Sequence, residues 1–328
     1  MVDASSVRSA AMAFVIAALF ILGSAPACVA QLVNGAAERR AIARGIQSWA
    51  IQYRRINVFE VAASPFDLTV IDFRPDVLFG TEWPFQKSDV RLMQRKSDGS
   101  RRLLFGYLSV GEAEDYRWYW PRVWTDSPNQ RPPWIGTENE RWRGNYPVRF
   151  WNSAWQDILF GRTEAYLDRL IDAGFDGVYL DRVDVYQEFV NERPSAEADM
   201  VDLVSRLSAH AHRRNPRFLV TLQNAEELTV KPEIRAAIDV FAKEDLFFGV
   251  DHDGRRNSRE AVEYSVRPMR ALRRAGVKVL LIEYPRDEAS AAEIRGRAAA
   301  EGFTLLLADR GLGALAPVYP AVAARAKK

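Results

Sequence analysis

The chain has 328 residues, of which 48% are hydrophobic, 11% aromatic and 27% charged. This composition is typical of a globular domain and excludes an intrinsically disordered chain. The formal net charge is +2, with basic and acidic residues interspersed. A nucleic-acid-binding protein usually concentrates its positive charge on one face, so we expect no nucleic-acid partner.

The first 30 residues are typical of an export signal. An uninterrupted apolar run, Ala10–Gly23, precedes small residues at Cys28 and Ala30. The run is shorter than the roughly 20 residues that span a membrane, so we expect cleavage after Ala30. The mature protein is then periplasmic or extracellular and has no stable membrane partner. An uncleaved anchor, or a lipoprotein attached at Cys28, stays open as an alternative.

Eight short apolar runs rich in β-branched and aromatic residues follow, and amphipathic segments separate them. The predicted strands are Trp49–Tyr53, Leu68–Phe73, Leu103–Val110, Phe175–Val183, Phe218–Asn224, Val240–Asp245, Val277–Tyr284 and Phe303–Asp309. The predicted helices are Val58–Ala63, Asp157–Asp172, Ala196–Arg214, Ser258–Ala275 and Glu288–Ala300.

Strands that alternate with helices pair in parallel through crossovers. Eight such units favour an α/β fold of the (β/α)8 TIM-barrel type, as a single domain over 31–328 with its core at 48–320. No Gly-x-Gly-x-x-Gly follows the first strand, which argues against a dinucleotide-binding sheet.

Carboxylates recur where the predicted strands end, and catalytic groups of such barrels sit there. They are Asp72, Glu112, Asp181, Asp184, Glu244, Asp245, Glu283 and Asp309, with Asn224 and Glu226 after the fifth strand. One such acid is often only a helix cap, but paired carboxylates cleave glycosidic bonds. Strand alternation puts Asp181 on the face of Tyr179 and Glu244 on the face of Ala242, so this pair is favoured.

A long segment, 112–156, separates the third strand from its helix and is rich in aromatic residues. It carries seven of the nine tryptophans: Trp118, Trp120, Trp124, Trp134, Trp142, Trp151 and Trp155. Exposed rings would stack on sugars, whereas buried rings would only hold the long loop in place. Both interpretations stay open, although Trp151 and Trp155 are expected to pack.

Other chemistries have weaker support. The chain has three histidines, and His210 and His212 are two positions apart on one predicted helix, so they cannot face one ion. Asp251–Asp253 could hold a cation but is more typical of a polar loop. The sequence contains no Gly-x-Ser-x-Gly motif, so a serine nucleophile has no support. We expect neither a metal nor a cofactor. A barrel acting on phosphorylated metabolites, with 308–313 around Arg310 as phosphate cradle, stays an alternative.

Three segments in this order resemble a known family: YLSVGEAEDYR at 107–117, WNSAWQ at 151–156 and FDGVYLD at 175–181. They look like the endo-α-1,4-polygalactosaminidase-like barrel glycoside hydrolases, family 114, and the resemblance extends from about residue 49 to 319. It implies an exported enzyme that cleaves α-1,4-linked galactosamine polymers, the partly deacetylated polysaccharides of biofilm matrices.

The resemblance also implies roles for individual residues. Asp181 matches the nucleophile of a retaining mechanism and Glu244 matches the general acid/base, with Asp245 open as the alternative acid. Substrate contacts are expected from Asp72, Tyr107, Glu112, Tyr116, Arg117, Tyr179, Asp184, Asn224 and Glu283. The surplus acids would attract a polymer with free amines into an anionic mouth. The alternative function is a non-catalytic carbohydrate-binding barrel of the same fold.

Overall fold

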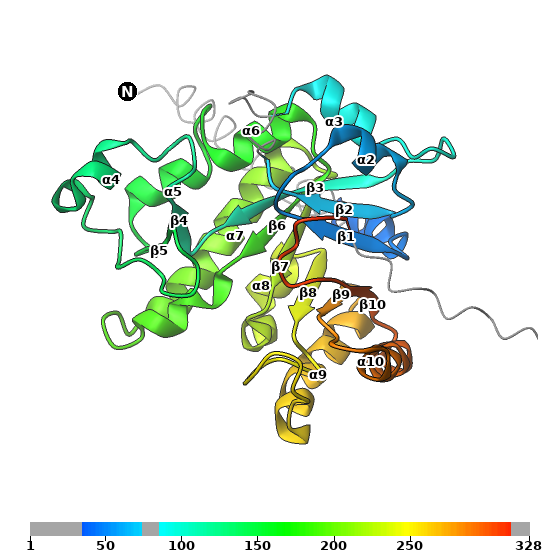
Figure 1. The fold of residues 1–328 in the computed structure, drawn as a ribbon. Coiled ribbons are helices and arrows are strands. Elements are labelled where there is room, and N and C mark those ends of the chain that lie inside the picture. The colour runs from blue at the N-terminus through cyan, green and yellow to red at the C-terminus, as the bar shows by residue number, and fades with distance from the viewer. Residues whose placement is uncertain (1–34, 74–84, 316–328) are drawn as a thin grey trace, which may run out of the picture.

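The structure is a computed structural model that describes residues 35–73 and 85–315 (Figure 1). The predicted export signal, 1–30, lies outside the described residues. Eight parallel strands form one sheet in chain order, which confirms the predicted (β/α)8 barrel. They are β1 (Trp49–Gln52), β2 (Leu68–Ile71), β3 (Leu103–Ser109), β6 (Gly177–Asp181), β7 (Leu219–Gln223), β8 (Val240–Glu244), β9 (Lys278–Glu283) and β10 (Thr304–Leu307).

The barrel is nearly closed, because the first and last strands meet through individual hydrogen bonds. The indole Nε1 of Trp49 on β1 donates to the carbonyl of Thr304 on β10 at 3.0 Å. Beyond the strand ends, the backbone N–H of Tyr53 donates to the carbonyl of Leu312 at 2.9 Å. These contacts hold β1 next to β10.

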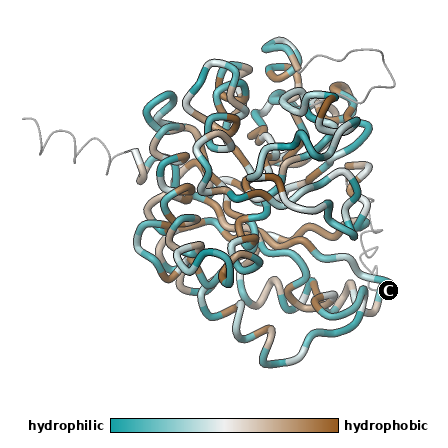
Figure 2. The backbone as a smooth tube through the Cα atoms, turned by 90° about the vertical axis from the view of Figure 1, so that its left-hand side faces the viewer, coloured by the Kyte–Doolittle hydropathy of each residue, from teal (hydrophilic) through white to brown (hydrophobic). Residues whose placement is uncertain are grey.

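Alternate residues of each strand face the barrel interior or the surrounding helices. The interior cluster contains Tyr179, Val240 and Ala242, whereas Leu180 and Phe241 pack outside. Figure 2 shows the hydrophobic segments gathered through the middle of the molecule. The predicted strand parity is therefore confirmed, and it directs the side chains of residues 181 and 244 inward.

Helices cover the outside of the barrel and one closes its base. They are α2 (Val58–Ala63), α3 (Lys87–Met93), α7 (Ala196–Arg214), α8 (Pro232–Ala237), α9 (Arg259–Arg274) and α10 (Glu288–Glu301). The helix at 35–44 adds Ala43 to the interior cluster, and its Arg39 pairs with buried Asp239 at 3.0 Å. Within the described ranges, no helix has both the length and the apolar character to cross a membrane.

The predicted helix at 157–172 is wrong as a continuous element. The structure has α5 (Ser153–Leu159) and α6 (Tyr166–Ala173) there. Gly161 between them has a φ of +91°, which breaks a right-handed helix. Its N–H donates to the Asp168 carboxylate at 2.8 Å, which fixes the break.

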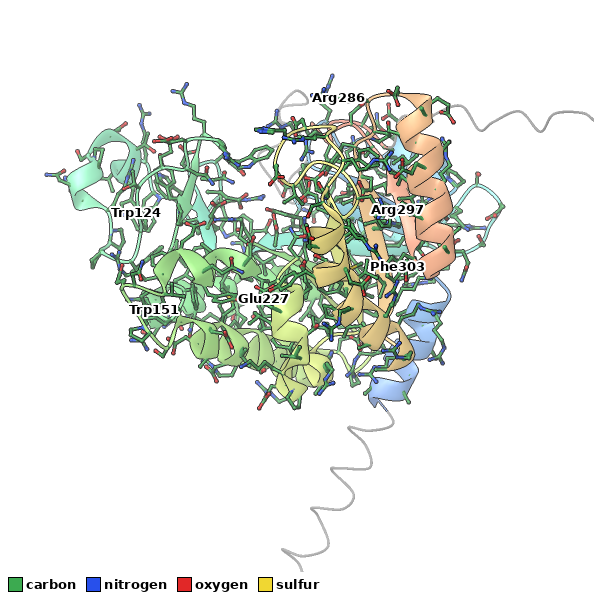
Figure 3. All side chains as sticks on the ribbon, turned by 90° about the horizontal axis from the view of Figure 1, so that it is seen from below. Trp124, Trp151, Glu227, Arg286, Arg297 and Phe303 are labelled. Atoms are coloured by element: carbon green, nitrogen blue, oxygen red, sulfur yellow. The ribbon has the colours of Figure 1, made fainter. Side chains whose placement is uncertain are left out.

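The long segment after β3 forms a lobe beside the barrel. It contains β4 (Glu112–Glu114), α4 (Val123–Asp126), the 3₁₀ turn η2 (Pro128–Gln130) and β5 (Asn145–Pro147), and β4 pairs antiparallel with β5. Trp124 and Trp151 lie in this lobe, across the molecule from Arg297 and Phe303 (Figure 3). Buried Trp155 contacts the rings of Tyr119 and Trp134, so aromatic packing holds the lobe together.

Two glycine-to-alanine substitutions test the packing. A Cβ at Gly177 on β6 would lie 2.6 Å from the Leu219 carbonyl oxygen and from the Phe105 ring, whereas one at Gly296 on α10 meets nothing within 4 Å. We expect Gly177→Ala to lower the free energy of unfolding by about 1–3 kcal/mol. Gly296→Ala should raise it by about 0.5–1 kcal/mol. Urea denaturation measures both, and equal effects would contradict the described barrel packing.

Candidate active site

A cleft of about 590 Å³ opens at the carboxyl ends of the strands. Ten of the eleven site residues predicted from the sequence line it. These ten are Asp72, Tyr107, Glu112, Tyr116, Arg117, Tyr179, Asp181, Asp184, Asn224 and Glu244. The parallel strands bring them together from positions more than 170 residues apart in the sequence, as Asp72 and Glu244 show. The cleft is the candidate active site.

Asp181 ends β6 at the floor of the cleft. Its Oδ2 accepts a hydrogen bond from the Tyr107 hydroxyl at 2.7 Å, and its Oδ1 accepts one from the Arg182 backbone N–H at 2.7 Å. Burial raises the pKa of Asp181 to about 7, while these two donors oppose the rise and the nearby Glu244 carboxylate adds to it. Near neutral pH, Asp181 therefore exists in both ionised and protonated forms.

Glu244 ends β8, two strands along the sheet from Asp181. Its Oε1 accepts a hydrogen bond from the Tyr284 hydroxyl at 2.5 Å, and its Oε2 accepts one from Gln223 Nε2 at 3.0 Å. Burial raises the pKa of Glu244, which favours a carboxyl that retains its proton. A partly buried, oriented carboxyl of this kind suits a general acid.

The neighbouring Asp245 points away from this position. Both of its oxygens accept hydrogen bonds from Arg310, at 3.0 and 2.9 Å, and it does not line the cleft. Arg310 also pairs with Asp253 at 3.0 Å, so its guanidinium is engaged by carboxylates. The geometry favours Glu244 over Asp245 as the acid, and it leaves Arg310 poorly placed to cradle a phosphate.

The residues directly after β6, β7 and β8 share an unusual backbone conformation. Arg182, Asn224 and Asp245 have φ values of 57°, 54° and 54°. This left-handed region costs free energy for residues other than glycine, and such residues often gather at functional sites. Asn224 also accepts the Glu244 backbone N–H on its Oδ1 at 3.2 Å. The sharp turns leave each strand-end side chain directed inward while the chain leaves the barrel.

A buried arginine, Arg117, pairs with two carboxylates on one side of the cleft, and one of them, Asp72, is a predicted substrate contact. Arg117 donates to Asp72 and, at 2.6 Å, to Glu114, which also accepts the Tyr116 hydroxyl at 2.6 Å. The Tyr166 hydroxyl donates to Asp72 at 3.4 Å. The ion pair between Asp72 and Arg117 therefore stabilises the wall of the cleft.

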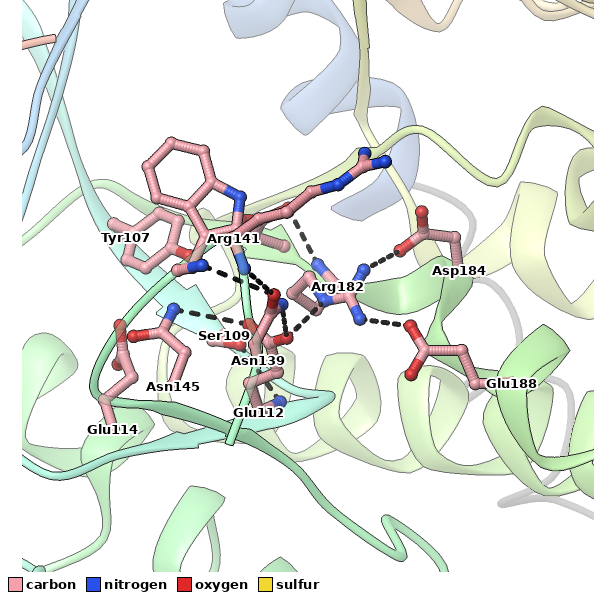
Figure 4. A network of polar contacts seen from close by, with 12 residues as sticks. Tyr107, Ser109, Glu112, Glu114, Asn139, Arg141, Asn145, Arg182, Asp184 and Glu188 are labelled. Atoms are coloured by element: carbon pink, nitrogen blue, oxygen red, sulfur yellow. Dashed lines mark hydrogen bonds and ion pairs between the residues drawn. The ribbon is translucent and has the colours of Figure 1, made fainter. Parts of the chain in front are cut away.

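Glu112 is held in a second network, which joins the lobe to β6 (Figure 4). Its two oxygens accept hydrogen bonds from Asn139 at 2.8 Å and Asn145 at 3.3 Å, and Arg182 lies 3.1 Å away as an ion-pair partner. Arg182 also pairs with Asp184, at 3.6 Å. Glu112 is thus engaged by protein groups on both oxygens, which makes it an anchor of the cleft wall.

Acidic and basic side chains are equally numerous in the lining of the cleft, which contains six carboxyl groups and six arginines. Three of the arginines, Arg54, Arg55 and Arg143, line the cleft with no carboxylate of the described residues within ion-pair distance of them. The expected anionic mouth is therefore wrong for this cleft, because nearby arginines neutralise the surplus acids.

The expected substrate contact from Glu283 also needs correction. This residue ends β9, its side chain is fully buried, and it does not line the cleft. Its oxygens accept the backbone N–H groups of Phe247 at 2.7 Å and Phe248 at 3.3 Å. Burial raises its pKa to about 8. Glu283 therefore fixes the loop that follows β8.

Several lining residues were not predicted from the sequence. Tyr53 follows β1, Gln223 ends β7, and Tyr284 follows β9. Strand alternation alone could have identified Gln223, since it shares a face with Thr221 on a predicted strand. The same alternation puts Tyr284, the last residue of a predicted strand, on the interior face with Leu280 and Ile282.

The candidate cation loop at Asp251–Asp253 does not gather further ligands. Across 35–73 and 85–315, no group of three or more His, Cys, Asp or Glu side chains has an arrangement suited to a metal ion.

Comparison with known proteins finds one matching family model and several similar proteins. A family model, that of Glycoside-hydrolase family GH114, matches residues 30–322. An uncharacterized protein of Deinococcus radiodurans is 36% identical over 274 residues, which cover 82% of this chain and 82% of that protein. An uncharacterized protein of Thermotoga maritima is 31% identical over 248 residues, which cover 73% and 71%.

Among solved structures, the chain is similar to the glycoside hydrolase domain of PelA from Pseudomonas aeruginosa. The TM-score is 0.61 at 20% sequence identity, and the match covers 83% of this chain and 98% of that one. At this identity the likeness concerns the fold, which agrees with the observed barrel.

The raised pKa of the partly buried Asp181 carboxyl predicts a pH-dependent stability. Its pKa is raised on folding, so its contribution to stability is fully present below about pH 4 and is lost as the pH rises through about 7. Asp181→Asn should therefore raise the free energy of unfolding by about 1–3 kcal/mol near pH 8 and change it little near pH 4.

Urea denaturation at the two pH values measures this difference. Asp126→Asn, at an exposed carboxylate on α4, is the matched control and should leave the unfolding free energy nearly unchanged at both. A gain for Asp181→Asn that is equal at both pH values would contradict the burial argument.

Proposed function

The chain belongs to glycoside-hydrolase family GH114, and from this premise we propose that it is an exported endo-acting enzyme that cleaves α-1,4-linked galactosamine-containing polysaccharide. The main support is the pair of partly buried carboxyls, Asp181 and Glu244, which enter one cleft from strands β6 and β8. Glycosidic bond cleavage requires two such groups. The apolar run at 10–23 supports export.

The proposed mechanism is retaining. The Asp181 carboxylate attacks the anomeric carbon as the bond to the leaving sugar breaks, and Glu244 gives its proton to the departing oxygen. Glu244 then takes a proton from water, whose oxygen attacks the same carbon and displaces Asp181. After the first step Glu244 is ionised and can accept the water proton, and after the second step both carboxyls have regained their starting protonation states. The free product carries the original anomeric configuration.

The surrounding donors fit these roles. The Tyr107 hydroxyl and the Arg182 N–H both donate to Asp181, and they would stabilise its ionised form before attack. Gln223 and Tyr284 hold Glu244 by one hydrogen bond on each oxygen, which fixes its direction. Catalysis depends on such positioning of the reacting groups.

The charge balance of the cleft bears on the sugar at the reaction centre. Four lining acids, Asp72, Glu112, Glu114 and Asp184, are paired with Arg117 or Arg182. This leaves no carboxylate besides the proposed catalytic pair to receive an ammonium group. The arrangement favours N-acetylated, uncharged galactosamine residues over free-amine residues.

The central experiment measures oligosaccharide release from partly N-acetylated α-1,4-galactosaminogalactan. We expect the wild-type protein to release products and the variants Asp181→Asn and Glu244→Gln each to lose at least about 100-fold in rate, since each removes a group that reacts. Asp245→Asn is the matched control, and we expect it to lose far less than Glu244→Gln.

The pH profile of the same reaction provides a second readout. Because attack needs ionised Asp181, kcat/KM of the wild type should fall as the pH drops below about 7. A folded wild-type protein that binds the polymer without releasing products would replace the proposal with the carbohydrate-binding alternative.

Substrate preference can be tested with two matched polymers. On fully N-acetylated and fully deacetylated α-1,4-galactosamine oligomers of equal length, we expect the N-acetylated series to have the higher kcat/KM by about tenfold. Raising the salt concentration should not increase this ratio, because the cleft has no excess of carboxylates whose attraction for ammonium groups salt would screen. A preference for the deacetylated series that weakens with salt would refute the charge argument.

A further inference from the structure

One tryptophan of the lobe differs from the other six in its surroundings. Each of the six contacts at least one other aromatic ring, as Trp120 does with Trp124 and Tyr146. Trp142 has neither an aromatic nor a cationic ring partner among the described residues. Its side chain is 52% exposed, and it lines the cleft. Six of the seven tryptophans therefore pack against other aromatic rings of the protein, and Trp142 does not.

The chain around Trp142 forms a closed turn. Asn139 N–H donates to the Asn145 carbonyl at 2.8 Å, and Asn145 N–H donates to the Trp142 carbonyl at 3.0 Å. The Asn139 side-chain oxygen accepts the N–H groups of Arg141 at 3.0 Å and Trp142 at 3.3 Å. The backbone that carries the indole is thus fixed by hydrogen bonds within the turn.

The turn is anchored to the catalytic end of the barrel through Glu112. The side chains of Asn139 and Asn145 each donate to one oxygen of this carboxylate, which is only 2% exposed (Figure 4). Arg182 pairs with the same carboxylate and directly follows Asp181 in the sequence. This ion pair, whose carboxylate is buried, therefore connects the turn to the residue that follows the proposed nucleophile.

We propose that Trp142 forms a carbohydrate-binding subsite of the cleft, where its indole stacks on the C–H face of a pyranose ring next to the cleavage point. A single exposed apolar side chain is ordinary on a protein surface. Here the exposed ring borders the catalytic cleft, and buried polar groups hold it there. This subsite suits a polymeric substrate, because the Trp142 indole on the lobe would contact a sugar other than the two that meet at Asp181 and Glu244. This inference rests on the proposed function.

The first test separates binding from catalysis on the galactosaminogalactan polymer. Trp142→Ala should raise KM about tenfold, which corresponds to about 1.4 kcal/mol, while kcat falls far less. Trp142→Phe keeps a flat ring and should recover most of the affinity. Phe59→Ala is the matched control, since Phe59 is 74% exposed on α2 and does not line the cleft. A KM for Trp142→Ala equal to that of the control would overturn the proposal.

The second test needs no turnover. In the Asp181→Asn background, affinity electrophoresis in gels containing the polymer should show weaker retardation for Trp142→Ala, and also for Asn139→Ala, which removes an anchor but keeps the indole. If wild type binds without cleaving and Trp142→Ala loses binding, the subsite stands while the hydrolase proposal fails. If wild type cleaves and both variants bind normally, the hydrolase proposal stands and the subsite is refuted. If wild type neither binds nor cleaves the polymer, both are refuted.

Discussion

The ion pair between Arg182 and Glu112 connects the two parts of the protein that border the cleft. Glu112 begins the lobe on β4, and Arg182 leaves the barrel directly after Asp181. Because the Glu112 carboxylate is buried, loss of the Arg182 charge would leave it with only the hydrogen bonds from Asn139 and Asn145. The lobe is therefore part of the active-site structure. Its aromatic core stabilises it internally, and this pair sets its position.

Much of the fold could be predicted because its information is local. β-Branched runs and their alternation identified all eight strands, and the same parity directed Asp181 and Glu244 inward. The choice between Glu244 and Asp245 could not be made this way, since it depends on the left-handed turn at Asp245 and on its pairing with Arg310, 65 residues along the chain. Likewise, only tertiary packing distinguishes Trp142 from the other six tryptophans of the lobe, which contact aromatic rings.

Two carboxylates that end adjacent strands have different roles. Glu244 shares its face of β8 with Ala242 in the barrel interior, whereas Glu283 shares its face of β9 with Leu281, which packs outside. Glu283 binds backbone N–H groups of the next loop and Glu244 faces the cleft. Strand alternation therefore distinguishes the two carboxylates. Composition was a poor guide to local potential, because arginines from distant segments neutralise the acids.

The contacts that complete the barrel have a consequence for how the chain folds. Arg39 reaches Asp239 across 200 positions, and Trp49 reaches Thr304 across 255. An emerging chain that has not yet reached β8 lacks both contacts, so its first helix and first strand have nothing to close against. Folding to the native state must therefore await nearly the whole chain, and such long-range closure is intrinsically slow.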